Sequence, residues 1–236
     1  MSAFQAEDGG SIPPTRSKRT TTTSMTIKDV YNTYGIPPNL QEHMIRVASV
    51  VAHIEEHWIG PTVEWKIAIQ TALLHDIGNI VKFDLDNHPE FLGEGQNDLE
   101  CWRNKQQEMI KTYGSDDHEA TRKILFELDV DKNIIETILL KSFSNSINTK
   151  NSNNWILKIL YYADLRVLPF GIGTLDNRIN DVKDRMPKYT NRPDFMILVN
   201  ACYDIESQIQ DNLDIQINEM SNETIPLNQA FLATTI

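Results

Sequence analysis

Apolar residues recur every three or four positions through most of the chain, which is the spacing of helices that are buried on one side. The stretch from Asn39 to Trp58 is a clear case, because Val47, Val50 and Ile54 fall on one helical face. No stretch alternates apolar and polar residues over a length that would indicate a strand. The pattern therefore predicts an all-α fold.

Breaks in this pattern divide the chain into separate helices. Asn39 and Thr62 are expected to cap two of them at their N-terminal ends, and Gly78 stands where a C-cap glycine belongs. Residues 80–98 and 142–154 are expected to be loops. The expected helices run from Thr26 to near Gly35, over 39–58, from Thr62 through His75, and over 99–113, 118–128, 132–141, 155–167 and 195–213.

Composition divides the chain into three parts. Residues 1–24 contain Gly and Pro pairs and a run of threonines with almost nothing to bury, so we expect a disordered tail. Residues 25–212 hold the periodic pattern and are expected to form one compact helical domain. Residues 213–236 are expected to form a polar C-terminal extension.

The charge and cysteine content limit the partners. A formal net charge of −11 argues against a nucleic-acid polymer, because phosphate contact favours a basic surface. A small phosphorylated substrate stays open, since a metal ion supplies positive charge locally. The chain shows neither a signal peptide nor an apolar run of roughly 20 residues, and its two cysteines are far apart. We expect a cytoplasmic protein without a membrane partner; the sequence does not indicate an oligomeric state.

The stretch Leu73–Asn79, LLHDIGN, places an imidazole and a carboxylate side by side at the end of an apolar helix. A buried carboxylate is costly unless it is paired or binds a metal ion. Two further polar residues are expected to face inward, because His43 shares a helical face with Val47 and Asp164 shares one with Leu160. Polar groups from three helices should therefore meet in the interior.

Two interpretations fit the four residues His43, His75, Asp76 and Asp164. Two imidazoles and two carboxylates can hold a divalent ion, and helical bundles build such sites from facing side chains. A single inward-facing His or Asp, however, is more often a hydrogen-bonded structural residue. Spacing alone leaves both interpretations open.

The order of these residues resembles the HD superfamily of metal-dependent phosphohydrolases: His43, then His75 and Asp76 in LLHDIGN, then Asp164 in YYADLRV. The resemblance covers about residues 25–212. It implies an all-helical domain in which His43, His75, Asp76 and Asp164 bind one divalent ion. Mixed His and Asp ligation suits Mn²⁺, Fe²⁺, Co²⁺, Ni²⁺ or Zn²⁺.

The activity that the resemblance implies is hydrolysis of a nucleotide or another small phosphate ester by metal-activated water. Asp76 and His118 are the expected catalytic residues. Arg46, Lys82 and Arg166 lie close in sequence to the expected ligands and are candidates to bind the substrate phosphate. For each of these three residues, the alternative interpretation is an ordinary charged side chain exposed to solvent.

This chain departs from the family pattern in two places. His118 resembles the further histidine of dinuclear members, but the next helix reads LLKSF over 139–143, which disfavours a second metal bound through His118. His118 either contacts the phosphate or the attacking water, or is a solvated residue at a helix start. One nucleotidase branch has a catalytic glutamate where this chain has Asn79. A non-catalytic HD-fold binder or sensor of a phosphorylated ligand is therefore the alternative.

The segment His53–His57 matches H-x-x-E-H, the inverted zinc-peptidase signature, and its two histidines share a helical face. So short a motif often arises by chance, and this one stands just before Gly60 and Pro61. A polar helix end is the simpler interpretation. A zinc peptidase is the third candidate function.

Overall fold

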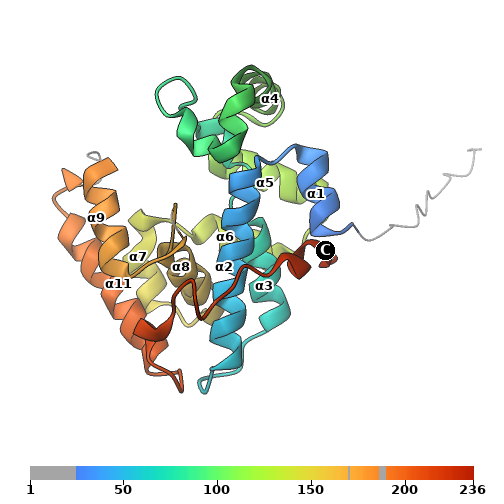
Figure 1. Ribbon diagram of the computed structural model, residues 1–236. Coiled ribbons are helices and arrows are strands. Elements are labelled where there is room, and N and C mark those ends of the chain that lie inside the picture. The colour runs from blue at the N-terminus through green and yellow to red at the C-terminus, as the bar shows by residue number, and fades with distance from the viewer. Residues whose placement is uncertain (1–24, 170, 186–189) are drawn as a thin grey trace, which may run out of the picture.

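The computed structural model describes residues 25–169, 171–185 and 190–236. In these residues almost all regular structure is helical, and the sheet pairs two strands of two residues each (Figure 1). The all-α fold predicted from the apolar spacing is confirmed. The expected disordered tail, residues 1–24, lies outside the described residues.

Helix α2 (Pro38–Glu56) forms the centre of the fold and packs against α3 (Trp65–Leu74) and α8 (Trp155–Arg166). Its apolar stripe is fully buried, since Val47 and Val50 are 0% exposed. Burying one aliphatic side chain stabilises a fold by about 1.5–3 kcal/mol. The stripe that predicts this helix is therefore also the face that holds it in the core.

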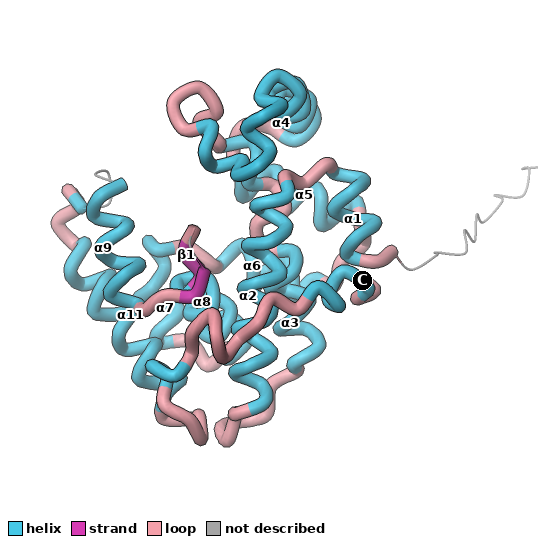
Figure 2. Tube along the Cα trace, viewed as in Figure 1, coloured by secondary structure: helices cyan, strands magenta, loops and turns pink. Residues whose placement is uncertain are grey.

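The other elements surround this centre, and Figure 2 shows how far helices dominate over strands and loops. The hairpin of β1 (Val167–Leu168) and β2 (Gly171–Ile172) is antiparallel and directly follows α8. The other α-helices of the described residues are α1 (Ile27–Tyr34), α4 (Leu99–Tyr113), α5 (Asp117–Glu127), α6 (Lys132–Leu140), α7 (Ser146–Asn151), α9 (Leu175–Arg185) and α11 (Phe195–Gln210). Short 3₁₀ helices lie at Asn79–Lys82, Pro89–Asp98, Phe143–Asn145, Ile217–Glu219 and Gln229–Ala233.

The ends of α1 follow the residues that predict them. The Thr26 hydroxyl accepts a hydrogen bond from the backbone N–H of Asp29, which satisfies one of the unpaired donors of the first turn. Gly35 ends the helix in the left-handed conformation, with φ of 60°. The predicted short helix ending near Gly35 is confirmed.

Two predicted caps are wrong. Asn39 lies inside α2, which begins at Pro38, because the fixed φ of proline suits the first turn of a helix. Helix α3 begins at Trp65 after Glu64 rather than directly after Thr62. Neither helix has a side-chain hydrogen bond at its N-cap, so side-chain capping does not define these two starts.

Some segments without a strong apolar pattern are nevertheless helical. The segment 142–154, predicted as a loop, contains α7, whose Ser146 hydroxyl is buried and donates to the carbonyl oxygen of Leu198. Residues 80–98, also predicted as a loop, contain 3₁₀ turns. Helix α9 is not predicted at all, because its sequence LDNRINDVKDR is mostly polar.

The C-terminal segment 213–236 packs along the helices. It crosses in front of α2 and α3 and ends beside α1, as Figure 1 shows. Met220 and Ile225 are buried in the core. The backbone N–H of Ile27 donates to the carbonyl oxygen of Thr234 at 2.8 Å. This segment therefore closes one side of the core, although the sequence predicts a polar extension.

None of the helices in the described part of the chain combines the length and the apolar character needed to span a bilayer.

Candidate metal centre

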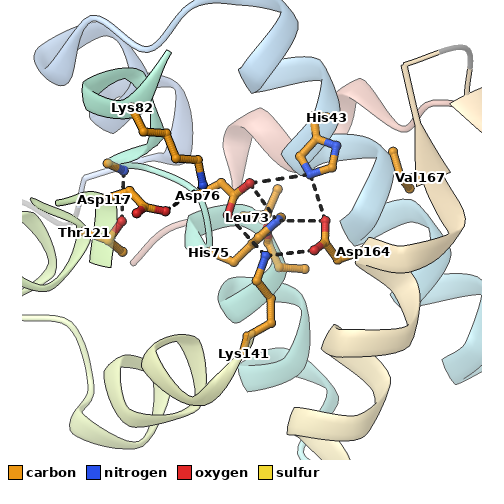
Figure 3. Close-up of polar contacts among 12 residues, drawn as sticks. His43, Leu73, His75, Asp76, Lys82, Asp117, Thr121, Lys141, Asp164 and Val167 are labelled. Carbon is orange, nitrogen blue, oxygen red and sulfur yellow. Dashed lines mark hydrogen bonds and ion pairs between the residues drawn. The ribbon is translucent and has the colours of Figure 1, made fainter. Parts of the chain in front are cut away.

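Four side chains from three separate segments of the sequence meet beside α2 (Figure 3). His43 comes from α2, Asp164 from α8, and His75 and Asp76 from the turn that follows α3. One ligand atom from each residue lies within 4.8 Å of the others. The four residues expected to be ligands are thus brought together, in a group that could hold a metal ion.

The imidazole nitrogens of this cluster face the carboxylates. Nε2 of His43 lies 3.1 Å from Oδ1 of Asp164 and 3.8 Å from Oδ2 of Asp76. Nε2 of His75 lies 3.5 Å from Oδ1 of Asp164 and 3.6 Å from Oδ2 of Asp76. Each carboxylate therefore has both imidazoles as neighbours, and the four groups could surround a shared ion.

The hydrogen bonding of His75 fits metal ligation. Its Nδ1–H donates to the carbonyl oxygen of Ala72 at 2.7 Å, which holds the proton on that nitrogen and leaves the Nε2 lone pair free. Nε2 is buried and has no hydrogen-bond partner among the described residues. A buried polar atom is rarely left unsatisfied, so a divalent ion at this position would complete the site.

Lys141 adds a positive charge to the cluster from the C-terminal end of α6. Its Nζ lies 2.8 Å from Oδ2 of Asp164 and 3.2 Å from Oδ1 of Asp76. Sequence reasoning noted the missing histidine in this segment but did not identify the lysine as part of the site. A lysine after an apolar helix is too common a pattern to single it out.

These charges stabilise one another. Burial by itself raises the pKa of Asp76, but His75 and Lys141 together hold it well below its usual range. Burial likewise raises the pKa of Asp164, and Lys141 and the contact with His43 more than reverse the effect. Burial lowers the pKa of Lys141, but Asp164 and Asp76 raise it by more, so the net shift is upward. The two carboxylates and the ammonium are therefore all charged near neutral pH.

Gly78 brings α5 close to the cluster. Its backbone N–H donates to Oγ1 of Thr121 at 3.1 Å, and a Cβ at position 78 would lie 2.5 Å from the backbone nitrogen of Thr121. Its predicted C-cap role is wrong, because α3 ends at Leu74 with His75 as the C-cap and the φ of Gly78 is −92°. The glycine instead permits a close approach of two backbones.

A cavity of about 500 Å³ lies at the cluster, within the roughly 300–1,000 Å³ typical of small-molecule pockets. Besides the four cluster residues, the polar lining consists of Asn79, Lys82, Asp117, His118, Thr121, Lys141, Ser142 and Arg178. The apolar lining consists of Ile138, Leu139, Phe143, Leu165 and Val182. The cavity therefore suits a ligand that has both a charged part and an apolar part.

Two of the predicted substrate-contacting residues line this cavity. Lys82 is about half exposed, and its Nζ lies 2.6 Å from Oδ2 of Asp117. His118, one residue later, is exposed at the start of α5 and also lines the cavity. Asn79 is buried beside them. The structure thus places both residues where a ligand in the cavity can reach them.

Arg46 and Arg166, also predicted to bind the substrate phosphate, do not line the cavity. Arg166 is 2% exposed and donates to the carbonyl oxygens of Ile217 and Met220 at 3.2 and 2.9 Å. Arg46 pairs with Glu42 one turn earlier, at 2.7 Å. Both guanidinium groups thus bind groups in their own surroundings, away from the cavity.

Arg178 on α9 is, beside Lys141, a second cavity-lining cation that sequence reasoning missed. Its guanidinium donates to the carbonyl oxygens of Asp164 and Leu165 at 2.9 and 3.1 Å. It therefore fixes the backbone that presents Asp164 and contributes a positive charge to the cavity. The polar sequence of α9 carries no signal that would assign Arg178 to a site.

Comparison of the chain with models of protein families, with curated proteins and with solved structures found no match in any of the three.

Proposed function

We propose that this protein is a metal-dependent phosphoric-ester hydrolase of the HD type that acts on a nucleotide or another small phosphate ester. The observation that carries the proposal is the meeting of His43, His75, Asp76 and Asp164 at a cavity of ligand size. The unpartnered Nε2 of His75 supports ligation of a metal rather than a closed hydrogen-bond network.

His43, His75, Asp76 and Asp164 would hold one divalent ion, and Mn²⁺, Fe²⁺, Co²⁺, Ni²⁺ and Zn²⁺ all suit this set of ligands. Such an ion lowers the pKa of bound water and polarises a phosphoryl oxygen, which supplies the nucleophile at neutral pH. His118 is not part of the ligand group, which supports a single ion rather than two.

Cationic side chains around the cavity would bind the phosphate. Lys82 and Arg178 line it, and Lys141 stands at the ligand cluster itself. Charge that develops on phosphoryl oxygens is stabilised by such preorganised cations. The ammonium of Lys141 already contacts the carboxylates of Asp76 and Asp164. A bound metal ion and this ammonium would therefore both be neutralised by the same two carboxylates.

His118 would move the proton that the reaction requires. Its imidazole lines the cavity and is able to donate a proton to a departing oxygen. Asn79 cannot take this role, because an amide does not ionise. Asp76, which is both ligand and hydrogen-bond acceptor, would orient the attacking water.

A non-catalytic sensor of a phosphorylated ligand is the second candidate. Lys141 favours it, because its ammonium neutralises Asp76 and Asp164 without any metal. In that case the cavity and its cations would bind the ligand, and no bond would be broken. The two functions differ in whether phosphate is released.

Phosphate release separates the two candidates. The purified protein would be stripped of metal, refilled in turn with Mn²⁺, Co²⁺, Ni²⁺, Zn²⁺ or Mg²⁺, and tested on a panel of nucleotides and simple phosphate esters. Turnover with one of these ions that disappears in Asp76→Ala supports the hydrolase. Ligand binding without release under every ion supports the sensor. A protein that binds neither metal nor phosphate ester contradicts both.

A further inference from the structure

A second group of metal-ligating side chains lies at the C-terminal end of α2. His53, Glu56 and His57 each offer one ligand atom, and these atoms lie within 4.8 Å of one another. The side chains of His53 and His57 are 14% and 30% exposed, whereas that of Glu56 is 71% exposed. The two imidazoles are thus partly shielded, while the carboxylate leaves the group open to an ion from solvent.

The geometry of the helix produces this group. Residues three and four positions apart are neighbours on a helical surface, so His53 has both Glu56 and His57 beside it. The two imidazole centroids are 4.8 Å apart, and Nδ1 of His53 lies 3.9 Å from Oε2 of Glu56. Two histidines one helical turn apart, together with a carboxylate, are a ligand set that suits Zn²⁺.

Asp214 completes the surroundings of His57. The Nδ1–H of His57 donates to Oδ1 of Asp214 at 2.9 Å. Ligating histidines commonly donate their second ring nitrogen to a carboxylate, which fixes the tautomer and the direction of the ring. Asp214 therefore holds the proton on Nδ1 and leaves Nε2 of His57 as the nitrogen that can bind an ion.

This group is separate from the central cluster. His53 follows His43 by ten residues on the same helix, which corresponds to about 15 Å along the helix axis. One ion therefore cannot bind at both places. Loss of either group leaves the other intact, so the two can be tested independently.

The surroundings of the second group indicate a structural ion rather than a peptidase centre. Its residues line neither the 500 Å³ cavity at the central cluster nor the 330 Å³ cavity beside Trp155. Instead it stands where two chain segments are joined. The backbone N–H of Asp214 donates to the carbonyl oxygen of His57 at 3.0 Å, and that of Ile59 donates to Asn212 at 2.9 Å.

We propose that His53, Glu56 and His57 bind a Zn²⁺ ion that fastens the end of α2 to the segment following α11. The ion would fix the position of His57. His57 in turn binds Asp214 through one side-chain and one backbone hydrogen bond. An ion that binds only the folded chain stabilises it by mass action. Zinc should therefore stabilise the full-length protein through this site as well as through the central one.

The test is the zinc content of the full-length protein after dialysis against Zn²⁺, measured by elemental analysis. The wild type should retain two ions, and the double variants His53→Gln/His57→Gln and Asp76→Asn/Asp164→Asn should each retain one. A zinc content in His53→Gln/His57→Gln equal to that of the wild type would overturn the proposal. A wild type with one ion, lost only in that variant, would support this site and contradict the central one.

A single substitution at an exposed position tests the same site in case the double variant does not fold. Glu56→Gln removes one ligand on the protein surface and should weaken zinc binding at this site at least tenfold, with circular dichroism unchanged. Glu55→Gln is the matched control, since it removes the same charge from the neighbouring exposed position and should leave the zinc affinity as it is. Equal affinity in both variants would contradict the assignment of Glu56 as a ligand.

Discussion

The ammonium nitrogen of Lys141 lies 2.8 Å from Oδ2 of Asp164 and so occupies one side of the cluster that would bind a metal ion. It also reaches Asp76, at 3.2 Å. The lysine thus neutralises part of the negative charge that two nearly buried carboxylates bring together. Stability of the metal-free protein and affinity for metal should therefore respond in opposite directions when this charge is removed.

Lys141→Met tests this relationship. In the presence of a chelator the variant should lose about 3 kcal/mol in free energy of unfolding, because two largely buried carboxylates lose their counter-charge. It should bind Mn²⁺ more tightly than the wild type, since a like charge no longer stands beside the ion. Urea unfolding with and without Mn²⁺ measures both effects.

Lys132→Met is the control for this experiment, because Lys132 lies on the same helix and its side chain is 83% exposed. Its exposed ion pair with Glu136 is worth about 0–1 kcal/mol. Lys132→Met should therefore leave the metal affinity unchanged. Equal urea midpoints for Lys141→Met and the wild type in chelator would contradict the role given to Lys141.

Gly78→Ala should damage the site through the backbone. The new Cβ would lie 2.5 Å from the backbone nitrogen of Thr121 and 2.9 Å from the carbonyl oxygen of Asp117, so α5 must move away. Overpacking of this kind costs about 1–3 kcal/mol. The melting temperature should fall and Mn²⁺ should bind more weakly. A variant with an unchanged melting temperature would show that the two segments separate easily.

The sequence predicts the parts of the fold that depend on a regular apolar pattern. Helix α2 is predicted by an apolar stripe that includes Val47 and Val50, and α8 is predicted by its own stripe. The inward direction of His43 and Asp164 follows from the same periodicity. The convergence of His43 and Asp164 could therefore be predicted, because each lies at a fixed angle to a buried stripe, whereas His75 and Asp76 lie on the turn after α3. The resemblance in residue order is the basis for proposing an ion site there.

The rest of the site depends on tertiary contacts that leave no local pattern. Lys141 and Arg178 reach the cluster only because α6 and α9 pack beside it, and α9 itself is mostly polar. Arg166 follows a ligand by two residues, yet on a helix that separation turns its side chain to another face. The role of Gly78 arises from the approach of α5, which no neighbouring residue in the sequence reveals.

Lys82→Met should separate ligand binding from stability. Lys82 is about half exposed and pairs with Asp117, so its loss should change the free energy of unfolding by less than about 1 kcal/mol. If the Lys82 ammonium binds the phosphate, the KM for the active phosphate ester should rise about tenfold, which corresponds to about 1.4 kcal/mol. Steady-state kinetics measure the effect, and an unchanged KM would place the phosphate elsewhere in the cavity.

Arg166→Met should have the opposite effects, a lower stability and an unchanged KM. The guanidinium is almost fully buried and donates to backbone carbonyl oxygens of Ile217 and Met220, which would lose their partners. Leaving such groups unsatisfied costs about 1–3 kcal/mol each, so the urea midpoint should fall clearly. The KM should stay as in the wild type, because Arg166 does not line the cavity. A raised KM in a stably folded variant would restore the phosphate-binding role first predicted for it.

Tyr34 should make the protein sensitive to alkaline pH. Burial raises its pKa to about 12, with a further contribution from Glu127, whose Oε2 accepts a hydrogen bond from the Tyr34 hydroxyl at 3.3 Å. The unfolded value is near 10, so the neutral hydroxyl stabilises the fold fully below pH 10, and this contribution is lost as the pH rises through about 12. The difference in tyrosinate absorbance between wild type and Tyr34→Phe should titrate near pH 12. A difference that titrates near pH 10 would show that the hydroxyl is solvated.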